Sequence, residues 1–162
     1  MITRYATRDD VAAIVTVIND AYRVEDFFVR GNRTSREDVE TRMAIPGAVF
    51  IVIDGEQPDR LAAAVWLEVN DRRGHFAMLS VDPALQGKGY GRALIDAIEK
   101  HCRDADCKAV DIEVVNLREE LPAFYEALGF VTTETAPFPD NGKLTREAHL
   151  VLMTKMLPVE MK

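Results

Sequence analysis

The chain has 162 residues, 48% of them hydrophobic and 29% charged, a composition suited to one compact domain spanning residues 1–162. Its formal net charge of −7 argues against generic electrostatic binding to nucleic acid or to an anionic membrane surface. The uninterrupted apolar stretches are too short for a membrane span, and the N-terminus lacks the layout of a secretion signal. We therefore expect a cytoplasmic protein.

The first half of the chain predicts two helices followed by three strands. Apolar residues recur at spacings of three and four between a cap at Thr7 and Tyr22, which indicates an amphipathic helix. A second short helix is predicted from a cap at residues 34–35 to a stop at residues 46–47. Three apolar runs separated by turn residues then predict an antiparallel meander of strands at residues 49–53, 61–69 and 75–81.

The second half predicts alternating helices and strands. A helix at residues 89–102 is followed by a strand at 109–115, a short helix at 119–128 that tolerates Pro122 in its first turn, and strands at 130–133 and 149–156. One more strand is predicted at residues 2–6. With no repeat or linker along the chain, these elements indicate a single α/β domain.

The two cysteines, Cys102 and Cys107, have no partners at zinc-ligand spacing. A disulfide between them is disfavoured in a reducing cytoplasm, so we expect two ordinary thiols and no metal site.

A glycine-rich turn lies between the strand at 75–81 and the helix that follows. Gly87, Gly89 and Gly91 allow backbone N–H groups to approach a ligand where a helix exposes its unpaired donors. Lys88 and Arg92 add two cations, so the local field favours a phosphate or pyrophosphate. The alternative is a tight strand-to-helix connection with no ligand.

Three phosphate-binding signatures can be compared with this turn. A P-loop requires glycine where the chain has Asp82, and a dinucleotide fingerprint requires G-x-G-x-x-G in an early parallel βαβ unit. Both fit poorly. The remaining pattern, Gln86-x-x-Gly89-x-Gly91 directly after a strand and Asp-Pro, resembles the acyl-CoA-binding motif of the GNAT superfamily of N-acetyltransferases.

A second motif strengthens this resemblance. Asn116 follows the strand at 109–115, and the helix after it ends in the sequence F-Y-x-x-L-G-F at residues 124–130, as in the family. The stretch between Asn116 and Tyr125 is slightly longer than in many relatives and contains Pro122. The resemblance covers nearly the whole chain. It implies an α+β fold with a mixed, mostly antiparallel sheet, flanked by helices and splayed between the fourth and fifth strands.

The resemblance also implies how the co-substrate acetyl-CoA binds. The pantetheine arm would lie in the opening of the sheet, with backbone N–H groups from Leu79 to Val81 holding the arm and the thioester oxygen. Asn116 matches the family position that reaches this arm. The pyrophosphate would be held by the glycine turn, made of Gln86, Gly87, Lys88, Gly89, Tyr90, Gly91 and Arg92.

Acetyl transfer to an amine needs a proton for the departing thiolate and a neutral nitrogen. Tyr125 matches the general acid of the family, and an ordinary phenol stays protonated at neutral pH. The alternative is that Tyr125 only packs beside Phe124. His75 is the candidate base. The alternative is that His75, which directly follows a turn, is simply an exposed side chain without a catalytic role. Glu113, Glu68 and a water chain remain alternatives.

The acceptor commonly lies between the first-helix loop and the last hairpin in this family. Phe27 and Phe28 are candidates to wall an apolar part of the acceptor, and Glu25 to attract an ammonium group. Equally, the two rings would cap the core. Arg23 and Arg30 would equally suit a carboxylate on the acceptor.

The predicted function is transfer of an acetyl group from acetyl-CoA to a small-molecule or peptide amine, by direct attack in a ternary complex. The acidity of the chain mildly favours a cationic amine. The alternative is an acyl-CoA-binding sensor without an efficient base. Dimers are frequent in the family, and the sequence leaves a homodimer open.

Overall fold

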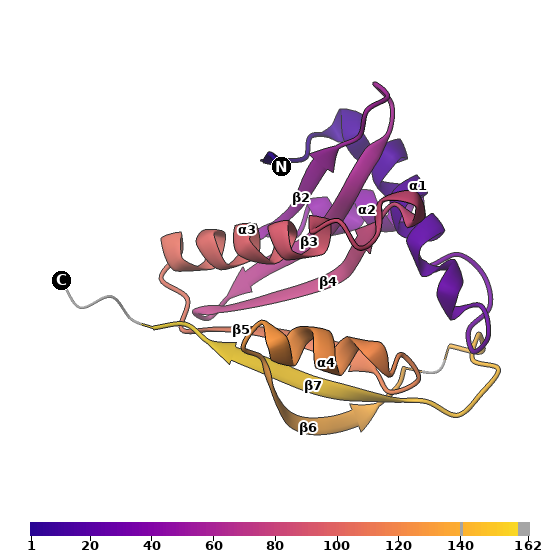
Figure 1. Cartoon of the computed structure of the whole chain (residues 1–162), viewed down its shortest axis with the longest axis vertical. Helices are drawn as coiled ribbons and strands as arrows, with labels where there is room; N and C mark the ends of the chain where they lie inside the picture. Colours follow the sequence, from indigo (N-terminus) through magenta and orange to yellow (C-terminus); the bar gives the residue numbers. More distant parts are fainter. Residues whose placement is uncertain (140, 159–162) are drawn as a thin grey trace.

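The computed structural model describes residues 1–139 and 141–158 (Figure 1). Within them, seven strands form one sheet in the order β1-β2-β3-β4-β5-β7-β6. The strands are β1 (Thr3–Tyr5), β2 (Ala48–Asp54), β3 (Leu61–Asn70), β4 (Arg73–Val81), β5 (Ala109–Val115), β6 (Val131–Pro137) and β7 (His149–Met156). The α-helices are α1 (Val11–Tyr22), α2 (Arg36–Met43), α3 (Tyr90–Asp104) and α4 (Glu120–Ala127).

The predicted elements are all present, with two shifts at strand ends. β4 begins at Arg73 rather than at residue 75, because Asp71 and Arg72 both take left-handed φ angles, 51° and 61°, and close a two-residue hairpin turn. Neither residue belongs to the Asn-Gly type that signals such a turn in a sequence. β6 runs on to Pro137 beside β7, beyond its predicted end at residue 133.

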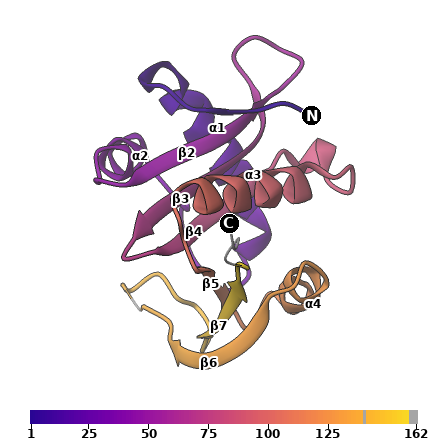
Figure 2. The same ribbon diagram turned by 90° about the vertical axis from the view of Figure 1, so that its left-hand side faces the viewer.

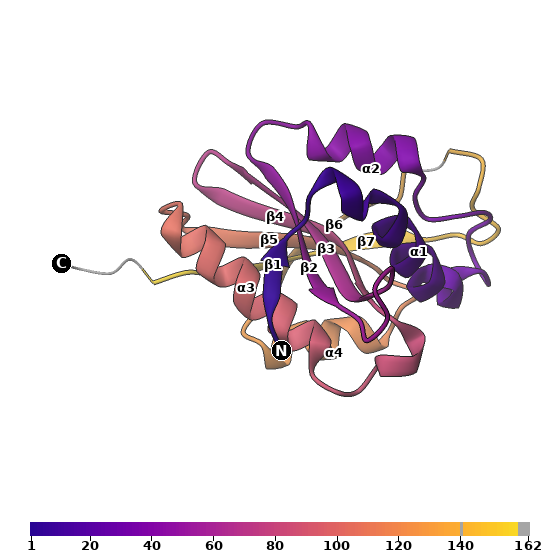
Figure 3. The ribbon, with the colours of Figure 1, turned by 90° about the horizontal axis from the view of Figure 1, so that it is seen from above.

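Helices cover both faces of the sheet. α1 and α2 lie on one face, and α3 and α4 lie on the other (Figure 3). Successive side chains of a strand point to opposite faces, so β2 and β3 supply both cores. Phe50, Val52 and Trp66 pack toward α1 and α2, whereas Ile51, Val65 and Leu67 pack with the buried residues of α3 and α4.

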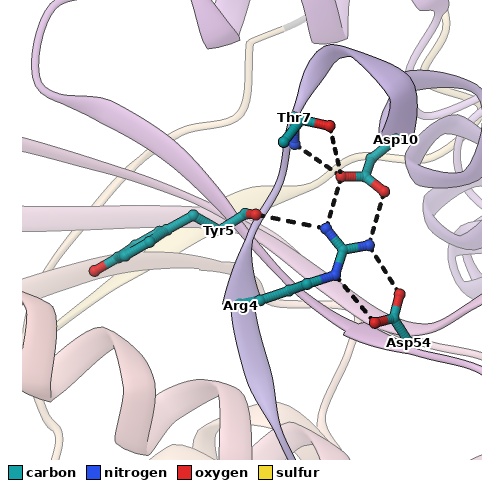
Figure 4. A network of polar contacts seen from close by, with 5 residues as sticks. All are labelled: Arg4, Tyr5, Thr7, Asp10 and Asp54. Atoms are coloured by element: carbon teal, nitrogen blue, oxygen red, sulfur yellow. Dashed lines mark hydrogen bonds and ion pairs between the residues drawn. The ribbon is translucent and has the colours of Figure 1, made fainter.

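An arginine ties the N-terminal strand to the first helix. The Arg4 guanidinium donates to the carboxylates of Asp10 and Asp54, each at 2.8 Å in its shortest contact (Figure 4). Asp10 also accepts from the backbone N–H of Thr7 at 2.7 Å, and so fixes the start predicted there. These contacts hold the Arg8–Asp10 turn that leads into α1.

The sheet splays between β4 and β5, as predicted. The two strands are parallel and pair only over Arg73–His75 with Ala109–Asp111; β4 then continues beside β3, and β5 continues beside β7. Figure 2 shows β5, β6, β7 and α4 grouped on one side of this division. A bulge in β4 opposite Ala64 and Trp66, with Met78 at a φ of 58°, bends β4 inside the splay.

Cys102 and Cys107 are buried free thiols, as expected from the sequence. Burial raises the pKa of Cys102 to about 12, and that of Cys107 is also raised by burial. Thiols held so strongly in the protonated form are poor nucleophiles. No helix in the described part of the chain is long and apolar enough to cross a membrane.

Candidate active site

A cavity of about 480 Å³ is found where β4 and β5 diverge. Strands β4 and β5 supply its floor, α4 supplies one wall, and the loops after α1 and before β7 surround the rest. The lining side chains used below come from β4 (His75, Met78, Leu79), β5 (Glu113), α4 (Tyr125), the loop after α1 (Glu25, Asp26, Arg30, Arg33) and the loop before β7 (Lys143).

His75 and Glu113 form the closest polar contact in the cavity. His75 Nε2 lies 2.6 Å from Glu113 Oε2, and the His75 and Trp66 rings pack at right angles with centroids 6.0 Å apart. The hydrogen bond to Glu113 raises the pKa of His75, and the same bond lowers the pKa of Glu113. His75 is therefore held in a fixed orientation, and it accepts a proton only above its raised pKa.

Tyr125 is both a core residue and a cavity residue. It is 3% exposed and packs among Phe76, Phe124 and Phe130, with ring centroids 5.0 to 6.0 Å away. It nevertheless lines the cavity, and no hydrogen bond to its hydroxyl occurs among the described residues. Burial raises the pKa of its phenol. The two sequence interpretations of Tyr125 are thus compatible: the ring packs, and the protonated hydroxyl is free to donate.

The glycine turn is exposed and rich in unused backbone donors. The described backbone hydrogen bonds stop at the N–H of Leu85 and resume at the N–H of Ala93, so residues 86–92 leave their N–H groups free at the start of α3. Gly87 and Gly89 have φ angles of 79° and 91°, which favour glycine. This cradle of donors fits the diphosphate of a coenzyme A molecule.

The turn also lies next to the cavity. A Cβ added to Gly91 would meet Phe124 of α4 at 3.5 Å and Leu79 of β4 at 3.9 Å, and Leu79 lines the cavity. Val81, two residues further, pairs with Ala63 of β3 and does not line it. Gln86, Lys88 and Arg92 are exposed, and Tyr90 packs partly against the core. A ligand held by the turn can therefore extend along Leu79 into the splay.

Asn116 closes the end of β5. Its Oδ1 accepts from the backbone N–H of His149 at 2.8 Å, and its own N–H donates to the carbonyl of His149 at 2.9 Å. Asn116 does not line the cavity. The side-chain carbonyl of Asn116 thus accepts a hydrogen bond from β7, and its side-chain NH₂ group is left for the predicted contact with a cofactor arm.

The structure separates the three residues predicted for the acceptor site. Glu25 lines the cavity, buried, and accepts from Arg118 Nη1 at 3.0 Å. Phe28 is completely buried, because the turn at Glu25 folds its ring beneath the loop, and Phe27 meets it edge-to-face with a centroid distance of 4.8 Å. Neither ring lines the cavity, so Phe27 and Phe28 do not form the wall of the acceptor site that was expected of them.

Several cavity residues were not singled out from the sequence, among them Arg33, Lys143 and Met78. Arg33 and Lys143 lie 110 positions apart, in loops whose sequences have no periodicity. Met78 has the sequence context of an ordinary strand residue, and only the structure shows its left-handed φ. The loops meet through a β-bridge between Val29 and Leu144. No local signal predicts such a bridge. Among the described residues no group of three His, Cys, Asp or Glu side chains is arranged to hold a metal ion.

Comparison with known proteins gives a consistent picture. The Acetyltransferase (GNAT) family model matches residues 15–130. Mycothiol acetyltransferase of Propionibacterium freudenreichii is 35% identical over 61% of this chain and 34% of its own length. That of Gordonia bronchialis is 30% identical over 78% of this chain and 42% of its own. The chain thus spans roughly a third to two fifths of these relatives.

Solved structures share the fold. The ribosomal-protein-S18-alanine N-acetyltransferase of Escherichia coli superposes with a TM-score of 0.78 at 16% identity, covering 99% of this chain and 96% of that one. The ribosomal-protein-alanine N-acetyltransferase of Brucella melitensis gives 0.77 at 20% identity, covering 97% and 100%. At these identities the likeness concerns the fold alone.

Proposed function

Because this chain belongs to the GNAT acetyltransferase family, we propose that it transfers the acetyl group of acetyl-CoA to an amine, by direct attack within a ternary complex. The observation that carries the proposal is the cavity at the splay. The His75–Glu113 pair lines this cavity, and so does Leu79, which lies next to the turn of free N–H donors. The chain acts in this proposal as one acetyltransferase domain.

Acetyl-CoA supplies the activated carbonyl and a thiolate leaving group. The N–H groups of residues 86–92 hold its diphosphate, with Lys88 and Arg92 adding positive charge. β4 beyond His75 has no strand partner on its β5 side, so its backbone in this stretch is available to the pantetheine arm. The bulge at Met78 turns the N–H of Leu79 out of the regular ladder, where it serves the thioester oxygen.

Proton transfer is assigned to the two remaining side chains. His75, oriented by Glu113, accepts a proton as the amine nitrogen bonds to the acetyl carbon. The carbon–sulfur bond then breaks, and the Tyr125 hydroxyl donates to the departing sulfur. Burial holds that phenol protonated. Neither cysteine lines the cavity, and burial raises the pKa of both thiols, so an acyl-enzyme on sulfur is disfavoured.

The amine is the least defined part of the proposal. The curated relatives carry the name mycothiol acetyltransferase, but the chain spans only about a third of the first of them. Amines related to mycothiol therefore belong in a substrate screen alongside amino acids, peptides and polyamines. We also propose that the protein forms a homodimer and acts in the cytoplasm, on the basis of the family resemblance.

One experiment tests the activity against the sensor alternative. Acetyl-CoA binding is measured by calorimetry, and release of free CoA thiol is then followed with the amine panel. Binding together with amine-dependent thiol release supports the enzyme. Binding without thiol release from any amine would overturn the proposal in favour of a sensor. His75→Asn separates the two further, because it should abolish release while leaving acetyl-CoA affinity unchanged.

A further inference from the structure

The cavity carries an excess of positive charge, although the chain as a whole has a net charge of −7. Its cationic lining residues are Arg23, Arg30, Arg33, Arg42 and Lys143, and its carboxylates are Glu25, Asp26 and Glu113. A cationic cavity in an acidic protein is a local feature that the overall charge does not explain.

Two of the three carboxylates in this cavity, the buried Glu25 and the exposed Glu113, are already paired. Glu25 accepts from Arg118, and Glu113 accepts from His75. Asp26 is exposed at the rim and has no ion pair with a described residue. An approaching ammonium group would therefore compete with existing partners at Glu25, which weakens the expectation that Glu25 attracts it.

Three cations are in the opposite situation. Arg23 and Arg42 have carboxylate partners three and four residues earlier in the chain, Asp20 and Asp38. Within the described chain no ion pair is formed by Arg30, Arg33 or Lys143, three exposed side chains that we call the loop cations, although the charge of Arg33 acts to lower the pKa of Glu25. A group of unpaired cations lining a cavity is suited to an anion that is not part of the protein.

Arg33 is held in place by something other than a charge. Its guanidinium carbon lies 5.3 Å from the centroid of the Tyr22 ring, a cation–π contact with another cavity residue. The guanidinium also hydrogen-bonds the Tyr22 side chain, and its other N–H groups are left for a ligand. Those N–H groups suit the oxygens of a carboxylate or a phosphonate.

Arg30 and Lys143 are brought together by backbone pairing. The N–H of Arg30 donates to the carbonyl of Lys143 at 2.9 Å, next to the bridge between Val29 and Leu144. The N–H of Thr145 donates to the carbonyl of Phe28 at 2.8 Å. The two loops are therefore fixed to each other before any ligand arrives, which lowers the entropic cost of binding there.

The loop cations are separate from the glycine turn that is proposed to bind the coenzyme phosphates. None of residues 86–92 lines the cavity, and the loop cations come from other segments. Figure 3 shows the start of α3 on the α4 side of the sheet, whereas α1 and α2 lie on the other side. The two cationic regions are therefore separate in the fold.

We propose that the loop cations bind an oxyanion on the acceptor, so that the acceptor is an amine that also carries a carboxylate or a phosphonate. The anion lies at Arg30, Arg33 and Lys143, and the amine lies toward the His75–Glu113 pair. This deepens the proposed function and rests on it for the transfer step. It also decides between the ammonium and carboxylate alternatives that the sequence leaves open.

Steady-state kinetics with matched acceptors test the proposal. Phenylalanine is compared with phenylalaninamide, 2-aminoethylphosphonate with ethanolamine, and spermidine serves as a purely cationic amine. The anionic member of a pair should have a kcat/KM at least tenfold higher, even though its amine is more basic and less often neutral. The carboxylate and phosphonate pairs show which oxyanion is accepted. Equal or higher kcat/KM for the neutral and cationic amines overturns the proposal.

Variants locate the effect. Arg33→Gln and Arg30→Gln should raise KM for the anionic acceptor about tenfold, with kcat and acetyl-CoA affinity little changed, because each removes a charge-assisted hydrogen bond to the oxyanion. Arg36→Gln is the matched control, since Arg36 is exposed on α2, pairs with Glu40 and does not line the cavity. Equal effects of all three substitutions would contradict a specific anion site.

A binding measurement keeps the anion site testable without turnover. N-acetylphenylalanine and its amide are titrated by calorimetry into the protein saturated with CoA. Tighter binding of the acid, lost in Arg33→Gln, supports the loop cations, and equal binding overturns them. If the acid binds tightly but no amine releases thiol, the anion site stands and the transferase proposal fails.

Discussion

The imidazole of His75 and the carboxylate of Glu113 lie 2.6 Å apart across the point where β4 and β5 stop pairing. His75 is opposite Asp111 in the last paired step, and Glu113 is two residues further along β5. The bond therefore spans the entrance of the splay, with the cavity beyond it. Both the protonation of His75 and the local geometry of the opening depend on this contact.

Glu113→Gln should shift the pH dependence of activity. The Glu113 hydrogen bond raises the pKa of His75 above its usual 6.5, and a base is active in its neutral form. We expect kcat/KM to rise with pH through this raised pKa in the wild type, and at lower pH in Glu113→Gln. A pH–rate profile from pH 5.5 to 9 measures the shift, and Glu56→Gln is the control, because Glu56 is exposed in the turn between β2 and β3 and does not line the cavity.

The same pair makes stability depend on pH. The folded pKa of His75 is raised, so its contribution is complete below 6.5 and is lost as pH rises through the folded value. The folded pKa of Glu113 is lowered, so its contribution is lost as pH falls. The loss of unfolding free energy in Glu113→Gln should therefore be larger at pH 6 than at pH 9. An equal loss at both values in urea titrations would contradict the coupling.

Tyr125→Phe should lower kcat by about 100-fold, the low end for loss of an acid–base group, with acetyl-CoA affinity unchanged. The hydroxyl has no described hydrogen-bond partner, so its removal should leave the unfolding free energy nearly the same. Phe124→Leu alters the neighbouring ring without touching this hydroxyl, and separates packing from catalysis. Full activity of Tyr125→Phe would remove the residue from the mechanism.

Gly89→Val should abolish detectable acetyl-CoA binding in calorimetry. Gly89 has a φ of 91° at the start of α3, where a β-branched residue is strained and the turn would reshape. Gly142→Val is the control, because Gly142 has a similar φ of 84° with open space for a Cβ, lies in the loop before β7 and does not line the cavity. It carries the same strain, so loss of binding in both would point to general destabilisation.

Arg118→Met should lower the unfolding free energy by about 3 kcal/mol at neutral pH, because it leaves the buried Glu25 carboxylate without its partner. Burial raises the pKa of Glu25 already, and loss of Arg118 raises it further. Protonation relieves the cost, so the defect should shrink as pH falls toward 5. Adding Glu25→Gln should restore much of the stability at pH 7.5, and failure to do so would contradict the pairing.

Gly74→Ala should destabilise the protein by roughly 1–3 kcal/mol, a typical cost of overpacking. A Cβ at Gly74 would collide with Cys102 Sγ from α3, at the paired end of β4 and β5. Cys102→Ala makes room, so the double variant should be more stable than the sum of the single changes predicts. A double-mutant cycle in urea measures this, and simple additivity would contradict the contact.

The sequence by itself determined the elements and the family. Helical spacing in α1 and α3, apolar runs in β2 and β3, and alternation in β5 depend on residues close along the chain, so a local pattern is enough to predict them. The glycine turn likewise depends on the residue types at Gly87 and Gly89 and on the helix that follows. The splay between β4 and β5 came from the resemblance and is confirmed by the pairing.

Only the tertiary structure decided what the cavity contains. Phe27 and Phe28 are equivalent in sequence, yet one is exposed and the other buried, because the turn at Glu25 sets which ring faces the core. Glu113 meets His75 through strand register, and Lys143 meets Arg30 through pairing between distant loops. Contacts between residues far apart in the chain depend on how whole elements pack, and no local pattern encodes them.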